Sequence, residues 1–137
     1  MVSTLQAAIE VLRSPALASL QTYSSVVLTD GPVRYYRLGE TSGSTAVDSS
    51  PNSLNGTYDA TALVNQPGLL VGDADRAVSA GASTAVSATA TGLPSAAAPR
   101  TLETWFKSTT STVWSSLMSY GDVQVLLGDT SFRVTNP

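Results

Sequence analysis

The sequence contains no cysteine and no histidine, and only 12% of its 137 residues are charged. Without these residue types the chain can form no disulfide framework, no Cys/His zinc site and no histidine-based catalytic triad. Seven basic residues stand against ten acidic ones, for a net charge of -3, and the basic residues form no cluster. The electrostatic footprint of a nucleic-acid-binding protein is therefore missing.

Long apolar runs are missing as well. No run reaches the ~18 residues needed to span a membrane, which predicts no membrane insertion. Glu10 and Arg13 interrupt the N-terminal apolar stretch, so it lacks the unbroken core of a signal peptide. Apolar residues still make up 42% of the chain, too many for a disordered protein. We expect a globular protein folded in a cytoplasm, which also fits a virion component.

Residues 1–22 are predicted to be helical and to act as an N-terminal anchor for assembly. Ser3 and Gln6 have the spacing of a capping box, and Pro15 ends or kinks the helix. The apolar residues with helical spacing are Leu5, Ala8, Ile9 and Leu12. Because so short a helix is marginal in water, it must pack on its own domain, on a copy of itself or on another protein.

From residue 23 onward the pattern is mainly β. Short apolar and aromatic segments alternate with turns rich in Gly, Pro and Asp, which is typical of an antiparallel sandwich or barrel. Residues 23–28 fit either a helical turn or a strand. The expected strands are residues 33–38, 57–58, 86–91, 101–107, 113–120, 123–127 and 131–135.

Four blocks of sequence carry a family resemblance. They are DGPVRYYRLGE (residues 30–40), AVDSSPNSLNGTY (46–58), GDADRAVSAG (72–81) and RTLETWFK (100–107). In order and spacing they resemble the laminin-G-like, concanavalin-A-like jelly-roll domains. Three positions depart from the family's pattern: Tyr36 stands where many members have Trp, Pro51 replaces a Gly, and Ala80 replaces a Phe. The resemblance implies a jelly-roll domain over residues 23–137.

The family's later half normally adds several strands that residues 23–137 do not contain. The resemblance therefore implies that the domain is truncated, and that the polypeptide continues past Pro137 or a partner chain supplies the missing strands, since half a sandwich would expose its sheet edges. A helix followed by such a domain, without a signal peptide, is similar to minor tail proteins of actinobacterial phages. That resemblance implies a virion location, partners among other tail proteins, and a homo-oligomer.

Glycosidases also use this sandwich fold, and they need two carboxylates that flank the scissile bond. Glu103 shares its predicted strand face with Trp105, but no acidic residue lies at the neighbouring positions of that face. We therefore interpret Glu103 as a structural or surface residue, and the chain as non-enzymatic.

Two loops contain oxygen ligands of the kind that Ca²⁺ prefers. Asp48, Asn52 and Asn55 lie in one loop, and Asp73 and Asp75 lie in the other. Asx residues beside Gly and Pro are also ordinary turn formers, and neither loop has the carboxylate density of a dedicated site. Turn formation is the favoured interpretation, with calcium as the alternative and no other cofactor expected.

Four aromatic residues would stack on sugar rings if they were exposed. Tyr35 and Tyr36 are adjacent in a predicted strand, so one is expected in the core and the other on an outer face. Trp105 is expected in the core, and Trp114 on the surface. The sequence thus favours a jelly-roll component of a phage tail that binds host-surface carbohydrate. The alternatives are a purely structural assembly subunit and part of a glycoside hydrolase.

Overall fold

A computed structural model describes residues 21–80, 85–95, 98–108, 115–121, 123–127 and 132–135. The helix predicted over residues 1–22 lies outside this part of the chain, apart from its last two residues. In chain order the elements are α2 (Tyr23–Thr29), β1 (Thr45–Ala46), β2 (Gly56–Tyr58), β3 (Leu63–Gln66), β4 (Ala77–Ser79), β5 (Val86–Ser87), β6 (Ser115–Tyr120), β7 (Val123–Leu127) and β8 (Phe132–Thr135).

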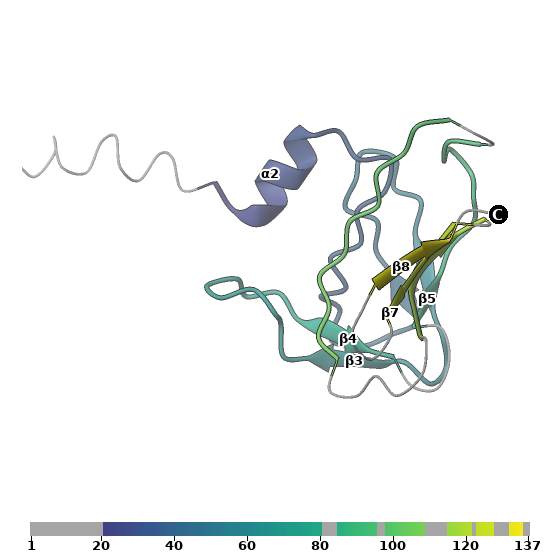
Figure 1. The fold of residues 1–137 in the computed structure, drawn as a ribbon. Helices are drawn as coiled ribbons and strands as arrows, with labels where there is room; N and C mark the ends of the chain where they lie inside the picture. Colours follow the sequence, from purple (N-terminus) through teal and green to yellow (C-terminus); the bar gives the residue numbers. More distant parts are fainter. Residues whose placement is uncertain are drawn as a thin grey trace, which may run out of the picture.

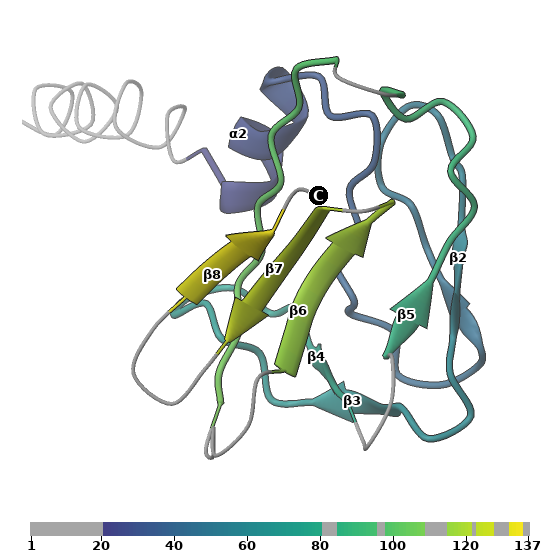
Figure 2. The ribbon, with the colours of Figure 1, turned by 45° about the vertical axis from the view of Figure 1, so that its right-hand side comes forward.

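The strands form three small antiparallel sheets, ordered β1–β2–β5, β3–β4 and β6–β7–β8. Helix α2 lies toward one end of the domain and β3–β4 toward the other (Figure 1), while β6, β7 and β8 run side by side (Figure 2). The prediction of a mainly β, antiparallel fold is confirmed. A jelly-roll sandwich is not, and the helix that the structure describes lies within the predicted β domain.

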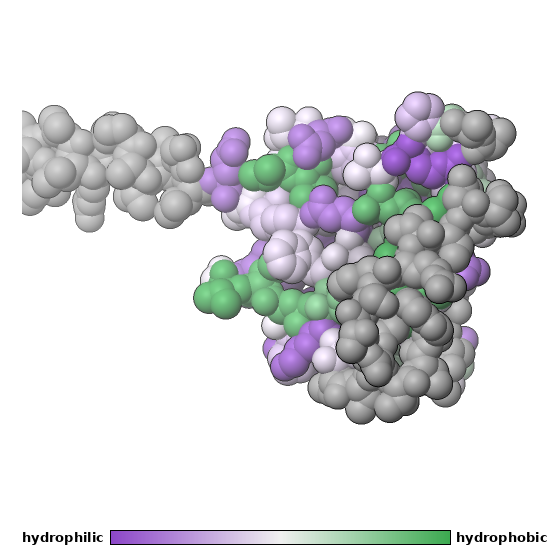
Figure 3. Space-filling view, in the orientation of Figure 1, coloured by the Kyte–Doolittle hydropathy of each residue, from purple (hydrophilic) through white to green (hydrophobic). Residues whose placement is uncertain are grey.

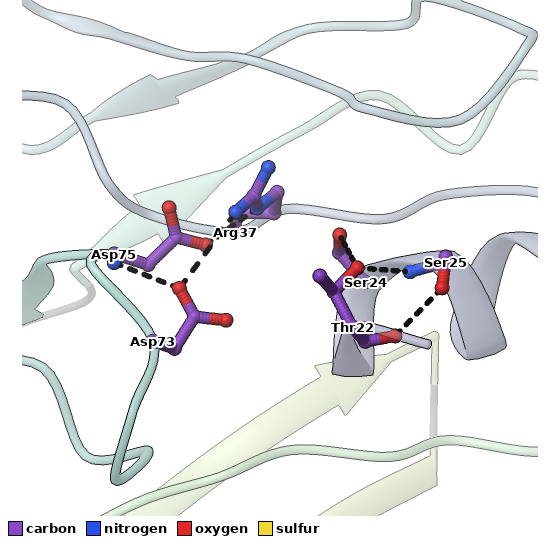
Figure 4. Close-up of polar contacts among 6 residues, drawn as sticks. All are labelled: Thr22, Ser24, Ser25, Arg37, Asp73 and Asp75. Carbon is purple, nitrogen blue, oxygen red and sulfur yellow. Dashed lines mark hydrogen bonds and ion pairs between the residues drawn. The ribbon is translucent and has the colours of Figure 1, made fainter. Parts of the chain in front are cut away.

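Helix α2 begins and ends at residues suited to those positions. The Thr22 side chain accepts a hydrogen bond from the Ser25 N–H at 3.2 Å, which caps the N-terminus (Figure 4). At the other end Gly31, with φ +64, donates its N–H to the Leu28 carbonyl, and Pro32 prevents continuation. No residue of the helix is fully buried, so α2 packs against the surface of the domain.

The strand predicted over residues 33–38 is wrong. A single antiparallel bridge, Tyr36 to Asp48, replaces a ladder. The Asp48 carboxylate accepts a hydrogen bond from the Tyr35 N–H at 2.9 Å. In a regular ladder a carbonyl of the neighbouring strand would accept this bond. Leu38 has φ 59, which ends any extended run. A buried side chain thus fixes this segment without regular pairing.

The strand predicted over residues 101–107 is also wrong. No strand that the structure describes pairs with this segment, and every residue in it is exposed. Trp105, expected in the core, is 60% exposed. Figure 1 shows residues 98–108 as a long, nearly straight trace that passes α2. The alternation in TLETWFK indicates a local preference for a strand, but within the described residues no strand pairs with it.

The other predicted strands fare better. The structure contains β2 where residues 57–58 were expected, β7 over the predicted range, and β6 and β8 inside theirs. The predicted strand 86–91 shortens to Val86–Ser87, the two residues that pair with Tyr58 and Thr57 of β2. The short strands β1, β3 and β4 were not predicted.

The fully buried centre of the described residues is small. It contains two apolar side chains, Ala46 and Tyr58, and two polar ones, Asp48 and Ser50. Strands β2 and β5 approach closely at Gly56, where a Cβ would meet the Ser87 carbonyl oxygen at 3.0 Å. The loop between β1 and β2 therefore organises the domain through polar contacts as much as through apolar packing.

Candidate functional site

An exposed aromatic cluster, formed by Tyr23, Glu103 and Trp105, joins α2 to the extended segment. The Tyr23 hydroxyl donates to Glu103 Oε1 at 2.5 Å. The Tyr23 and Trp105 rings meet edge to face, with centroids 5.9 Å apart and planes at 85°. We call these three residues the Trp105 cluster. It leaves most of the indole open to solvent while its orientation is fixed from one side.

The Tyr23 hydroxyl is held in its neutral, donating form. Burial raises the pKa of Tyr23, and the hydrogen bond to the Glu103 carboxylate raises it further. The second oxygen of Glu103, Oε2, accepts no hydrogen bond from the described residues. The Trp105 cluster therefore presents an apolar ring face beside a carboxylate oxygen that can still accept.

A charged group joins Arg37 to two aspartates, Asp73 and Asp75, on the loop between β3 and β4. Arg37 Nε is 2.5 Å from Asp75 Oδ2, and its Nη2 is 3.9 Å from Asp73 Oδ1 (Figure 4). The Asp75 N–H donates to Asp73 Oδ1 at 2.9 Å, so a hydrogen bond within the loop helps to fix the Asp73 carboxylate. These contacts hold the loop against the segment that carries Tyr35.

Tyr35 is influenced electrostatically by this charged group and by Glu103 of the Trp105 cluster. Burial raises its pKa most; Arg37 lowers it, while Asp75, Asp73 and Glu103 raise it. The Tyr35 hydroxyl thus lies within electrostatic reach of both groups. The charged group and the Trp105 cluster each join segments that are far apart in the sequence.

The loop of Asp48, Asn52 and Asn55 forms turns, and protein donors occupy its one carboxylate, that of Asp48. Both Asp48 oxygens accept protein donors, at 2.9 Å each: the N–H groups of Tyr35, Ser50 and Leu54, and the Ser50 hydroxyl. Asn55 Oδ1 accepts the Asp48 N–H, and Asn52 Nδ2 donates to the Val33 carbonyl.

The electrostatics of Asp48 agree with this saturation. Burial alone would raise its pKa, but the hydrogen bonds from the N–H groups of Tyr35, Ser50 and Leu54 outweigh burial and lower it. Asp73 and Asp75, in the other loop, are paired with Arg37. Among the described residues no group of three or more Asp or Glu residues is placed to hold a metal ion.

The other expected site residues have mixed outcomes. Glu103 bonds to Tyr23, and no hydrogen bond joins it to a second carboxyl in the described ranges. Tyr35 and Tyr36 are both half-buried, so the expected division into one core and one surface residue is wrong. Trp114 lies outside the described residues. Tyr23 was missed because its contact with Glu103 spans 80 positions, and no local pattern signals it.

A second surface feature is apolar. The loop between β3 and β4 projects from the domain, and Figure 3 shows it as a hydrophobic protrusion. Leu69 is 40% exposed at this loop, and Val71 is completely exposed. In the parts of the chain that the structure describes, no helix is long and apolar enough to cross a membrane.

Comparison with known proteins gave no match, whether with models of protein families, with curated proteins or with solved structures. Function is therefore argued from the residues and their geometry.

Proposed function

We propose that this chain is a non-enzymatic component of a phage tail or virion whose β domain binds host-surface carbohydrate at the Trp105 cluster. The observation that carries the proposal is the open face of Trp105, steadied by Tyr23 and flanked by the Glu103 carboxylate. A sugar ring has apolar C–H faces and a rim of hydroxyls. Such a ligand suits an aromatic plane with nearby hydrogen-bonding groups.

The surroundings supply further partners for hydroxyl groups. Glu103 Oε2 can accept, and the Tyr35 hydroxyl lies near the charged group of Arg37, Asp73 and Asp75. Charged groups that are already paired keep their positions, so binding would order few additional side chains. The proposal includes the virion location and the family resemblance, which rest on the sequence blocks alone.

Binding of the complete chain to an array of bacterial surface glycans tests the proposal. Replacing Trp105 with Ala should abolish retention, and Trp105→Phe should keep part of it, because the phenyl ring still presents a plane. Val71→Ala is the matched control, since it removes an exposed apolar side chain from the projecting loop. Equal retention of all variants, or no retention by the parent chain, would count against the proposal.

Two alternatives remain distinct from it. A purely structural assembly subunit is favoured by the exposed apolar residues Val26, Leu28 and Leu102, which a neighbouring protein would cover. It predicts incorporation into a particle without glycan retention. If the chain is instead part of a glycoside hydrolase, it should cleave a glycan, and the Glu103→Gln variant should not.

The proposed assembly role of residues 1–22 is tested separately. Deleting them should leave a folded domain that no longer enters the particle. Incorporation at the parent level would refute the anchor.

A further inference from the structure

The extended segment presents an open backbone edge. Residues 101–105 make no backbone hydrogen bond with any described residue, and Lys107 makes none either. In an extended chain the N–H and C=O groups of alternate residues point to the same side, so those of Glu103, Trp105 and Lys107 share one edge. An exposed row of donors and acceptors is a template for another strand.

The sequence along this edge is complementary to itself. In an antiparallel pair of two copies centred on Trp105, Glu103 of one copy faces Lys107 of the other, and symmetry repeats the contact. The two Trp105 side chains lie opposite each other on the same face. Opposite charges and aromatic pairs directly across strands stabilise pairing. A register shift by one residue would set Glu103 against Phe106 or Ser108, and a shift by two toward the N-terminus would set it against Trp105; either loses both ion pairs.

We propose that two copies of this chain associate through the edge of Glu103, Trp105 and Lys107, as an antiparallel strand pair with its twofold axis at Trp105. Such an interface is isologous and closes on itself, so it consumes the edge and yields a discrete dimer. The Tyr23 contact uses Glu103 Oε1, so Oε2 has one lone pair for Lys107 of the second copy and another for a sugar hydroxyl.

The dimer deepens the proposed function and rests on it in one respect only. Side chains on a strand project perpendicular to the pairing direction, so pairing leaves the Trp105 faces open. The two indoles then form one continuous platform, which would suit a linear polysaccharide rather than a single sugar. The dimer itself requires no glycan, so the two proposals fail separately.

Sedimentation analysis of the 137-residue chain, over about a hundredfold range of concentration, tests the dimer. We expect a species of twice the 14.1 kDa chain mass. Lys107→Glu places two like-charged pairs at the interface and should raise the dimer Kd roughly tenfold. Added salt should weaken the parent dimer but strengthen the Lys107→Glu dimer, because screening removes attraction in one and repulsion in the other.

A charge-swap mixture makes the test specific. Glu103→Lys should also weaken the dimer, whereas an equimolar mixture of Glu103→Lys and Lys107→Glu chains restores opposite charges at both contacts. The mixture should dimerise within about threefold of the parent Kd. Circular dichroism checks that Glu103→Lys folds without its Tyr23 bond. If Glu103→Lys does not fold, the opposite effects of salt on the parent dimer and on the Lys107→Glu dimer decide the question.

Several results would overturn the inference. A parent chain that stays monomeric, an open series of larger oligomers, or a dimer indifferent to Lys107→Glu would each do so. So would a mixture of folded variants that fails to recover. Glycan retention by a monomeric Lys107→Glu chain would leave the proposed function standing while the dimer lost its role in it.

Discussion

Replacing Asp48 with Asn should show how much of this domain's stability comes from one buried carboxylate. Asp48 is 4% exposed, and its two oxygens accept four protein donors. Asn has almost the same shape, so the change alters hydrogen bonding and charge while packing is kept. The loop between β1 and β2, and the segment with Tyr35, both depend on this side chain.

The magnitude follows from which donors the introduced amide can still satisfy. With its oxygen at the former Oδ1 position, the amide would keep the N–H groups of Tyr35 and Ser50. Its NH₂ group would then face the Leu54 N–H, while the Ser50 hydroxyl can rotate to accept. One part-buried N–H is left without a partner, at about 1–3 kcal/mol, and two bonds lose the strength of a charged acceptor. We expect a loss of about 3 kcal/mol in the free energy of unfolding.

Urea unfolding followed by circular dichroism and tryptophan fluorescence measures this loss. Asp30→Asn is the matched control, since it removes the same charge from an exposed carboxylate at the end of α2. It should change stability by less than about 0.5 kcal/mol. A loss of similar size in the two variants would refute the reasoning, because it would place the effect in net charge.

The pH dependence supplies a second test of the same carboxylate. The hydrogen bonds lower the pKa of Asp48 in the folded protein below the unfolded value of 3.8. Its stabilisation is therefore complete well above pH 3.8 and is lost as the pH falls through the folded pKa. Asp48→Asn should lose less stability than the parent over that acid range. Parallel acid profiles would contradict the assigned role.

Three further changes probe other contacts, each by urea unfolding. Tyr58→Phe removes the hydroxyl that donates to Glu40 and should cost about 1–2 kcal/mol at neutral pH. Burial and Glu40 raise the pKa of Tyr58 above its ordinary 10.0, so its stabilisation is lost as the pH rises beyond that value, and the variant should show less alkaline loss. Gly68→Ala would press its Cβ into the Asp75 carbonyl and should cost about 1–3 kcal/mol. Thr22→Ala removes the cap of α2 and should cost about 1 kcal/mol.

Local chemistry made parts of the fold predictable. Asp30, Gly31 and Pro32 indicate a turn, and the structure places a helix end there because glycine adopts positive φ readily. The mostly apolar residues 123–127, set between the Gly-Asp pairs of residues 121–122 and 128–129, predicted β7, which has partners on both sides. Such signals state a local preference, and the preference held where neighbouring strands were available.

The incorrect predictions share one physical origin. Periodicity tells which side chains of a strand would lie together, but it contains no information on whether another strand lies beside it. Residues 101–107 have the right alternation, but no strand in the described structure pairs with them. At residues 33–38 the Asp48 carboxylate replaced the carbonyls of a ladder. The Trp105 cluster depends on the contact between Tyr23 and Glu103, which only the tertiary fold creates.

If glycan binding is lost in acid, the loss has to be assigned either to the binding site or to the fold that supports it. The contact between Tyr23 and Glu103 holds the Trp105 cluster, whereas the Asp48 carboxylate fixes the segment that contains Tyr35. Loss of glycan retention in acid therefore has two separable origins, a change within the Trp105 cluster or unfolding around Asp48. Asp48→Asn separates the two, because it weakens the fold without touching the Trp105 cluster. If retention in acid follows the unfolding curve of each chain, the fold sets the limit. If the parent and the variant lose retention together while still folded, the Trp105 cluster sets it.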